Sequence, residues 1–300
     1  MTENDLTSQT IILNDGRTLG FAEFGDLKGK PIFYFHGHRS SRLEPKLYDF
    51  ENKQYNVRFI AVDRPGYGMS DFQKDRTLLD WPSDVLELAN ALKIGKFAVL
   101  GGSGGGPYVA ACAYKIPDRL TTCGLVSGLG PIKFGTEGMM RSNRMELFFG
   151  RRFTFMLRFL FWLQKRYIGR MKKKDKESLE KLFMKQAKKA PEPDRKIMGD
   201  PERIPLFLEL FEEPFRQGSK GPYHEGKLFA RDWGFDLEDI SPDLTIYLWH
   251  GELDIAVPLR MAELVCVAIP NCISKIYPDE GHLSTAVNHI EEIITTLTSN

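Results

Sequence analysis

One serine surrounded by glycines follows an apolar segment and constrains the fold of this chain more than any other feature. Residues 97–100 read Phe-Ala-Val-Leu, and residues 101–107 read Gly-Gly-Ser-Gly-Gly-Gly-Pro. Glycine is about 1 kcal/mol less favourable than alanine inside a helix, so such a run at a helix start indicates that the backbone requires it. Gly101 and Gly105 lie two residues on either side of Ser103, a Gly-x-Ser-x-Gly pattern that predicts a sharp strand-to-helix turn, the nucleophile elbow. The segment matches neither Gly-x-x-x-x-Gly-Lys-Ser/Thr nor Gly-x-Gly-x-x-Gly, the glycine-rich patterns that bind phosphates.

A serine at such a turn needs a base to accept its proton and an acid to orient that base. On sheets built around this elbow, the three residues occur in the order Ser, then Asp or Glu, then His. Downstream of Ser103 the chain supplies Asp254 and His282, each just beyond the end of a short apolar strand. We therefore predict Ser103 as the nucleophile, His282 as the base and Asp254 as the orienting acid, with Glu252 as the alternative acid.

The other five histidines are expected to have different roles. His36 and His250 each close a strand before a glycine, which is typical of structural turn contacts. His224 lies in a long insertion, and His289 falls within the closing helix. His38 is the strongest competitor for the base. It precedes the serine along the chain, however, and its main-chain N–H fits a role at the site better than its imidazole does.

The tetrahedral intermediate of this chemistry needs N–H donors directed at its oxyanion. The backbone N–H of Gly104, directly after the nucleophile, is the expected first donor. The loop after the first central strand reads His36-Gly37-His38-Arg39, so the main-chain N–H of His38 is the expected second donor. The alternative is that the His-Gly pair is only a tight turn.

Continuously apolar segments alternate with helical patterns along most of the chain. A hairpin is predicted over residues 10–24, and helices over 79–92, over 259–268 and from about residue 285. The apolar strands are expected at residues 31–35, 57–62, 97–100, 120–126, 244–249 and 273–277. Strands that are apolar on both sides need helices on both faces, so this alternation predicts an α/β fold with a parallel sheet.

Residues 131–232 interrupt the alternation with a stretch that contains no predicted strand. Between residues 141 and 176, twelve cations stand against two acids. We predict a core domain formed by residues 1–130 and 233–300, and a helical cap inserted as residues 131–232. Most aromatic side chains of the insertion are expected to pack inside the cap, and some to contact an apolar substrate. The aromatic residues concerned are Phe148, Phe149, Phe153, Phe155, Phe159, Phe161 and Trp162.

Composition gives no reason to expect nucleic acid or an acidic partner. The 300 residues carry a formal net charge of +1, with 42% hydrophobic and 27% charged residues, as in an ordinary globular protein. The cysteines form no Cys-x-x-Cys pair, so buried free thiols are expected rather than a disulfide or a metal site. These cysteines are Cys112, Cys123, Cys266 and Cys272. The polar first ten residues lack a signal-peptide pattern, and a cytoplasmic protein is expected.

With these motifs in place, the chain resembles the α/β-hydrolase superfamily over nearly its full length. The landmarks that carry the resemblance are His36-Gly37, residues 63–70, residues 101–105, residues 251–254 and Gly281-His282. The resemblance implies an eight-stranded, mostly parallel sheet, a helical cap after the sixth strand and no cofactor.

The sequence departs from the superfamily's common pattern in two places. The proline often found shortly after His-Gly is absent, with His38-Arg39-Ser40 in its place. Gly102 and Gly104 flank the serine where proline iminopeptidases and many haloperoxidase-like members carry bulky residues. Dehalogenases and epoxide hydrolases of this fold use aspartate at the elbow, so the serine argues against both.

The leading functional interpretation is a serine hydrolase that cleaves a small, apolar carboxylic ester through an acyl-Ser103 intermediate. Two alternatives stay open: hydrolysis of a lactone or a carbon–carbon bond by the same triad, and a slow ligand-sensing protein. The expected partner is a small-molecule ester, with no metal, no nucleic acid and no assignment of oligomeric state. The basic cap has the composition of a surface that contacts anionic lipid, but a solvated helix face is favoured, and weak or no membrane binding is expected.

Overall fold

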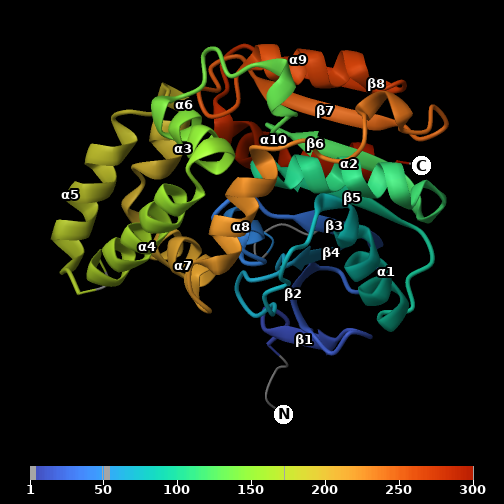
Figure 1. Ribbon diagram of the computed structural model, residues 1–300, viewed down its shortest axis with the longest axis horizontal. Coiled ribbons are helices and arrows are strands. Elements are labelled where there is room, and N and C mark those ends of the chain that lie inside the picture. The colour runs from blue at the N-terminus through green and yellow to red at the C-terminus, as the bar shows by residue number, and fades with distance from the viewer. Residues whose placement is uncertain (1–4, 49, 51–54, 172, 300) are drawn as a thin grey trace.

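The computed structural model describes residues 5–48, 50, 55–171 and 173–299. An eight-stranded sheet with strand order β1-β2-β4-β3-β5-β6-β7-β8 runs through its centre (Figure 1). The strands are β1 (Gln9–Ile12), β2 (Thr18–Gly25), β3 (Lys30–Phe35), β4 (Val57–Val62), β5 (Phe97–Gly102), β6 (Leu120–Val126), β7 (Ile246–Gly251) and β8 (Cys272–Tyr277). β2 pairs antiparallel with both β1 and β4, whereas the other neighbours pair in parallel. This confirms the mostly parallel eight-stranded sheet predicted from the sequence.

Helices cover both faces of the sheet, which explains why its central strands are apolar throughout. The core helices are α1 (Trp81–Ala91), α2 (Gly106–Lys115), α9 (Leu259–Ala268) and α10 (His282–Thr298). Side chains alternate between the two faces along a strand. In β3, Phe33 and Phe35 pack in the buried cluster that includes α1, α2 and α9, while Ile32 and Tyr34 pack in the cluster that includes α10. Each face therefore has its own hydrophobic core.

The parallel strands bring three segments that are distant in sequence to one edge of the sheet. β5, β7 and β8 run in the same direction and end at Gly102, Gly251 and Tyr277. In open α/β sheets, ligands bind outside the carboxyl ends of the strands. The loops that follow these three strands are therefore placed to build one site.

The chain between β6 and β7 forms a group of helices beside this edge, at the left of Figure 1. They are α3 (Arg141–Arg152), α4 (Thr154–Met171), α5 (Lys176–Ala187), α6 (Glu192–Met198), α7 (Ile204–Glu212) and α8 (Lys220–Phe229). Within this group, Leu157, Phe161 and Ile168 on one side of α4 pack with Phe215 in a small core of their own. Their spacing of four and seven residues is that of a single helix face.

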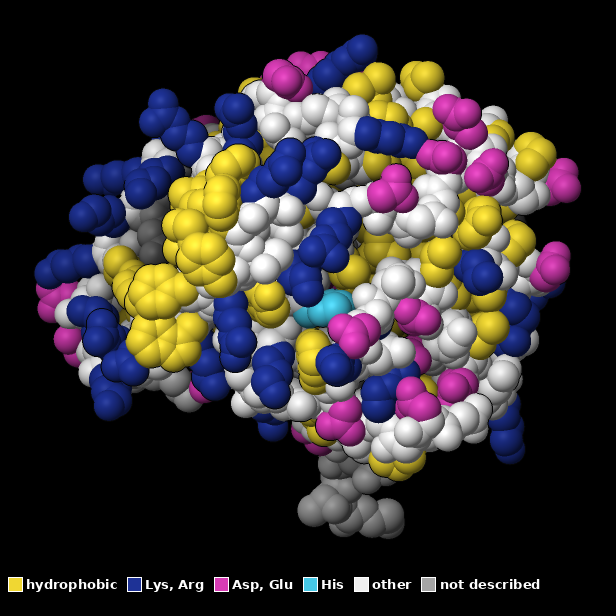
Figure 2. All heavy atoms as spheres, in the orientation of Figure 1, with side chains coloured by type: hydrophobic (Ala, Val, Ile, Leu, Met, Phe, Trp, Pro, Cys, Tyr) yellow, Lys and Arg dark blue, Asp and Glu magenta, His cyan; other side chains and the backbone are white. Residues whose placement is uncertain are grey.

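The expectation that most of the seven aromatic residues named above pack inside the insertion is wrong, because five of them are exposed. Phe148, Phe153, Phe155, Phe159 and Trp162 are all exposed. They form a band of hydrophobic side chains over α3 and α4, bordered by Lys and Arg (Figure 2). For the residues of α4, the physical reason is that apolar side chains occupy two sides of the helix: one side packs in the small core, which leaves the other side exposed.

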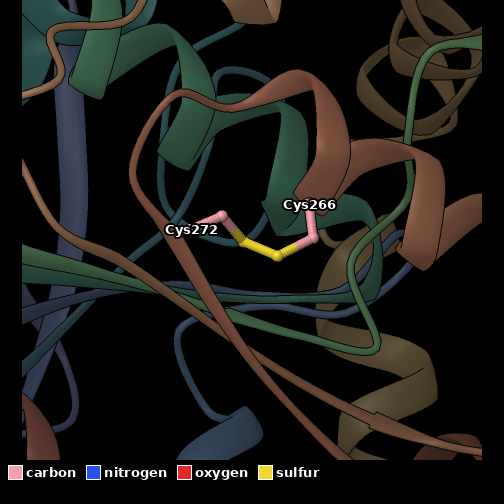
Figure 3. Close-up of a disulfide and its surroundings, with 2 residues drawn as sticks. All are labelled: Cys266 and Cys272. Atoms are coloured by element: carbon pink, nitrogen blue, oxygen red, sulfur yellow. A yellow bond between two sulfur atoms is a disulfide. The ribbon is translucent and has the colours of Figure 1, made fainter.

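A disulfide joins Cys266 near the end of α9 to Cys272 at the start of β8 (Figure 3). The expectation of four free thiols is therefore wrong for this pair. The two residues are six positions apart, and the reversal of the chain from helix to strand brings their Cα atoms within 5.3 Å. That distance falls inside the range that a disulfide can bridge. Cys112 and Cys123 are buried free thiols, and burial raises the pKa of each.

Candidate active site

The turn between β5 and α2 holds Ser103 in a left-handed backbone conformation, with φ of 52°. Non-glycine residues rarely adopt this conformation, and strain of this kind clusters at functional sites. The flanking glycines allow the turn to close. A Cβ on Gly105 would lie 2.1 Å from the carbonyl oxygen of Phe35 in β3, and one on Gly101 would lie 2.7 Å from the backbone of Gly105. Both positions exclude any larger residue, as the sequence pattern predicts.

The structure brings Ser103, Asp254 and His282 into one hydrogen-bonded chain. The Ser103 hydroxyl lies 2.9 Å from His282 Nε2, and His282 Nδ1 lies 2.7 Å from Asp254 Oδ2. The other oxygen of Asp254 accepts the backbone N–H groups of Ala256 and Val257, which fix the carboxylate. This arrangement leaves Nδ1–H donating to the acid and Nε2 free to accept the serine proton.

The alternative acid, Glu252, is placed differently. Its side chain is exposed, whereas Asp254 is buried. Its backbone N–H donates to the carbonyl oxygen of Tyr277, which ties the loop after β7 to the end of β8. The geometry therefore pairs His282 with Asp254.

The surroundings of His282 favour its protonated form. Burial lowers the pKa of the imidazole, but the nearby carboxylates, Asp254 foremost and then Asp194 and Glu44, together outweigh burial, and the pKa lies above the ordinary value of 6.5. Burial also raises the pKa of Asp254, but His282 foremost, with His250 and the Val257 N–H, outweighs burial, so that the pKa of the carboxyl lies below its ordinary value. Each partner stabilises the charge that the other acquires when His282 accepts a proton.

His282 is also held at its backbone by a residue that sequence reasoning missed. It is the first residue of α10, which begins three positions before the predicted start at Thr285. Asp194 of α6 accepts the N–H groups of His282, Leu283 and Ser284 at 2.9, 3.0 and 2.9 Å. The first N–H groups of a helix have no partner within the helix, and a carboxylate there also complements the helix dipole. A residue of the insertion thus caps the helix that starts with the candidate base.

The two predicted oxyanion donors lie next to each other. A Cβ built on Gly104 would be 2.8 Å from the backbone nitrogen of His38. The neighbouring Gly37 N–H donates to Glu44 at 2.8 Å, which fixes the loop after β3. A Cβ on Gly102 would be 2.9 Å from the Tyr34 hydroxyl. Glycines on both sides of Ser103 are therefore required, Gly104 by its packing against this loop and Gly102 by its packing against Tyr34 of β3.

The side chain of His38 forms a contact that sequence reasoning did not anticipate. Its Nε2 lies 2.6 Å from Glu146 of α3, and its Nδ1 lies 2.9 Å from Glu225 of α8. Burial lowers the pKa of His38, but the two carboxylates outweigh it and leave the pKa above 6.5. Glu225 is itself buried against Arg64, and its pKa lies well below the ordinary value. The His38 side chain therefore connects the loop after β3 to α3 and α8, two helices of the insertion.

The remaining histidines are engaged elsewhere. The Nδ1 of His36 contacts the carbonyl of Gly37 at 2.8 Å, and the Nε2 of His250 contacts that of Val257 at 2.9 Å. These are local turn contacts of the kind predicted for both residues. His224 contacts the carbonyl of Arg76, and His289 contacts Glu280.

A pocket of about 260 Å³ opens beside Ser103 and His282. Its apolar lining comes from Leu129, Met139, Met140, Leu147, Phe229, Ala256 and Val257. Its polar lining includes Arg39, Asn143 and Glu146. Glu146 already faces His38 and lies 3.6 Å from Arg39. The space next to the serine is therefore small and mainly apolar, and its carboxylate, Glu146, already faces the His38 imidazole and the Arg39 guanidinium.

Two further features concern metals and membranes. Within the described ranges, no group of three or more His, Cys, Asp and Glu side chains is arranged to hold a metal ion. None of the helices in the described part of the chain combines the length and hydropathy needed to cross a bilayer.

Comparison with known proteins gives a consistent assignment of the fold. The family model described as alpha/beta hydrolase fold matches residues 32–288. The proline iminopeptidase of Neisseria gonorrhoeae is 31% identical over 101 residues, which are 33% of this chain and 32% of that protein. The non-heme chloroperoxidase of Streptomyces lividans is 29% identical over 146 residues, 46% of this chain and 51% of that protein. The chain thus spans about a third to a half of the length of these curated relatives.

Among solved structures, an esterase from Rhodococcus sp. ECU1013 matches with a TM-score of 0.67 and 17% identity. The match covers 98% of this chain and 99% of that chain. At this level of identity the likeness establishes a shared fold.

Proposed function

The chain belongs to the alpha/beta hydrolase fold family, and we propose that it is a serine hydrolase that cleaves a small, largely apolar carboxylic ester. The observation that carries the proposal is the hydrogen-bonded chain from Asp254 through His282 to Ser103, at the wall of an apolar pocket. We further propose that residues 131–232 act as the cap, because Asn143, Leu147 and Phe229 of that segment line the pocket.

In the acylation step, Ser103 Oγ forms a bond to the ester carbonyl carbon while its proton moves to His282 Nε2. The carbonyl electron pair moves onto oxygen, and the N–H groups of Gly104 and His38 are the donors proposed for that oxyanion. Asp254 keeps Nδ1 protonated and stabilises the imidazolium. The intermediate collapses when the carbon–oxygen bond to the alcohol breaks and the alcohol oxygen takes the proton from His282.

In the deacylation step, water replaces the alcohol. His282, neutral again, accepts a proton from the water as its oxygen bonds to the acyl carbon of the Ser103 ester. The second tetrahedral intermediate then expels Ser103 Oγ, which regains the proton from the imidazolium. The net reaction consumes one water and releases an alcohol and a carboxylic acid.

Charge in the pocket supports an ester in preference to a substrate with a free amino terminus. A substrate ammonium group buried beside Ser103 would need an uncompensated carboxylate partner. Among the described residues that line the pocket, Glu146 carries the carboxylate that could pair with such an ammonium group. His38 and Arg39 already face this carboxylate. The apolar lining favours acyl or alcohol groups without charge.

Turnover of a substrate panel tests this proposal. The panel contains p-nitrophenyl esters of graded acyl length, matched lactones and a proline p-nitroanilide. We expect kcat/KM to be highest for short uncharged esters, to fall as the acyl chain outgrows the pocket, and to vanish for Ser103→Ala. Preferential cleavage of the proline anilide would replace the esterase proposal with a peptidase, and activity that survives in Ser103→Ala would remove the assigned nucleophile.

A further inference from the structure

An exposed aromatic surface on the outer side of the insertion has no role in the proposed reaction. We call it the aromatic–basic face; its apolar members are Met145, Phe148, Phe153, Phe155, Met156, Phe159, Trp162, Leu163 and Tyr167, all exposed. In Figure 2 it is the continuous band of hydrophobic side chains at the left, over α3 and α4. Large apolar patches on a protein surface mark sites of interaction, because their hydration is unfavourable.

Five rings of this face contact one another in two groups, one around Phe153 and one formed by Phe159 and Trp162. The ring centroids of Phe148 and Phe153 are 5.7 Å apart, and those of Phe153 and Phe155 are 6.5 Å apart. Phe159 stacks on Trp162 at 5.7 Å. At 71% and 57%, Phe155 and Phe159 are the most exposed of these side chains.

The charges around the rings are almost all of one sign. Helices α3 and α4 carry eight cations, which are Arg141, Arg144, Arg151, Arg152, Arg158, Lys165, Arg166 and Arg170. They carry one acid, Glu146, and it faces inward to His38. The guanidinium of Arg166 lies 4.9 Å from the centre of the Trp162 ring. The face is therefore strongly cationic, although the whole chain is nearly neutral at +1.

The sequence led us to expect weak or no membrane binding, but the rings are exposed and not buried. We therefore propose that the aromatic–basic face docks on the surface of an anionic lipid bilayer. A helix that lies in a membrane interface buries an aromatic and aliphatic side among the acyl chains, while flanking Lys and Arg contact anionic headgroups. Tryptophan and tyrosine are enriched at that depth of the membrane. Helix α4 matches this description, because its exposed residues include Phe155, Phe159 and Trp162 together with Arg158 and Arg166.

Charge complementarity favours the bilayer over the other occupants. A second copy of the chain docked through the same face would place two sets of cations against each other, which is unfavourable. A single-stranded nucleic acid is held in a basic groove with rings that stack on bases. In the aromatic–basic face, by contrast, the rings lie beside the aliphatic side chains of Met156 and Leu163 on the outer side of α4.

Docking through this face would bring the catalytic pocket close to the lipid, a consequence that rests on the proposed function. Leu147 of α3 lines both the pocket beside Ser103 and a surface hollow that also includes Met145 and Phe148. The same helix therefore separates the serine from the proposed membrane surface. Binding itself does not depend on the triad, so it is measured without turnover.

Flotation with lipid vesicles tests the docking proposal. The full-length Ser103→Ala protein is mixed with vesicles of phosphatidylcholine alone, or of equal parts phosphatidylcholine and phosphatidylglycerol. We expect binding to the anionic vesicles, weaker at physiological ionic strength than at low salt but retained, because the charges are screened while the rings stay buried. The triple variant Phe155→Ala/Phe159→Ala/Trp162→Ala should bind the anionic vesicles at least about tenfold more weakly than the parent protein. The double variant Arg158→Gln/Arg166→Gln should lose most of the preference for anionic lipid.

Two control variants keep the test specific. Ile12→Ala/Val267→Ala removes exposed apolar side chains elsewhere, and Arg260→Gln removes an exposed cation elsewhere. Both should bind like the parent protein, and circular dichroism should show that all variants are folded. Absence of binding to anionic vesicles at low salt, equal loss in the control variants, or binding of single-stranded RNA in place of vesicles would overturn the proposal. So would a dimer, detected by light scattering, that the triple aromatic variant abolishes.

Discussion

At the scale of single residues, the proposed reaction depends on how Asp254 and His282 share a proton. Burial lowers the pKa of the imidazole and the nearby carboxylates, Asp254 foremost, raise it, and the carboxylates together prevail. The base must be neutral to accept the proton of Ser103. The acidic limb of kcat/KM is therefore expected to have its midpoint above pH 6.5, the ordinary value for histidine.

Replacement of the acid tests this pairing. Asp254→Asn should lower kcat by about 10⁴-fold, because the imidazole loses its preferred tautomer and its counter-charge. The acidic limb should move to lower pH, since the pKa of His282 is no longer raised. Glu252→Gln is the matched control and should behave like the parent enzyme. The reverse pattern in the same ester assay would show that the acid is Glu252.

His38 leads to a second prediction at this scale. Its folded pKa is raised, so its contribution to stability is complete below pH 6.5 and is lost as pH rises through the raised value. The pKa of Glu146 is lowered, so its contribution is present above 4.5 and is lost as pH falls through the lowered value. Stability from this pair is expected to be greatest between these limits.

Melting temperature as a function of pH measures that contribution. Glu146→Gln should reduce the free energy of unfolding by about 1–3 kcal/mol between these limits, with a smaller loss at higher pH, where His38 is neutral in both proteins. A constant difference in melting temperature across the whole range would mean that Glu146 acts by packing and not by charge.

At the residue scale, sequence reasoning found the groups that a motif announces. Ser103 lies in a glycine pattern, and Asp254 and His282 follow strands in the order that the chemistry needs. The contacts of His38 with Glu146 and Glu225 join residues 108 and 187 positions apart, with no local pattern at either end. Such contacts depend on where the insertion packs, which the sequence alone does not define.

At the scale of elements, α10 shows how the insertion and the core act together. The strand and helix patterns predicted most elements of the core, including α9 at its observed bounds. The start of α10 was misplaced because its capping residue, Asp194, lies on another element 88 positions earlier. The local contact at this helix start, from the Gly281 N–H to the Ser284 hydroxyl, involves no acidic or amide side chain of the usual capping pattern, so the first turn was not recognised.

Asp194→Asn tests whether this cap positions the candidate base. The negative charge of Asp194 helps to raise the pKa of His282, so the acidic limb of kcat/KM should move to lower pH. The helix should lose about 1 kcal/mol of stability, and kcat should fall by about tenfold while KM changes little. Asp200→Asn is the control, because Asp200 caps a different short helix in the insertion. A loss of stability with an unchanged pH profile would make the role of Asp194 purely structural.

At the scale of the whole molecule, the sheet was predictable and the outer surface of the insertion was not. Apolar strands that alternate with helices specify a sheet covered on both faces, and the structure has that sheet. The exposed rings of α3 and α4 and the Cys266–Cys272 disulfide were both missed. A count of aromatic residues or cysteines does not say which side of a helix faces outward, or where the chain reverses.

The central claim is that Ser103 is the nucleophile of a hydrolase, and covalent labelling tests it most directly. The protein is incubated with a fluorophosphonate probe, and the labelled peptide is identified by mass spectrometry. We expect one adduct per chain, on Ser103, with slower labelling in His282→Ala and none in Ser103→Ala. A stoichiometric adduct on another residue, or ester cleavage by a protein that the probe does not label, would contradict it.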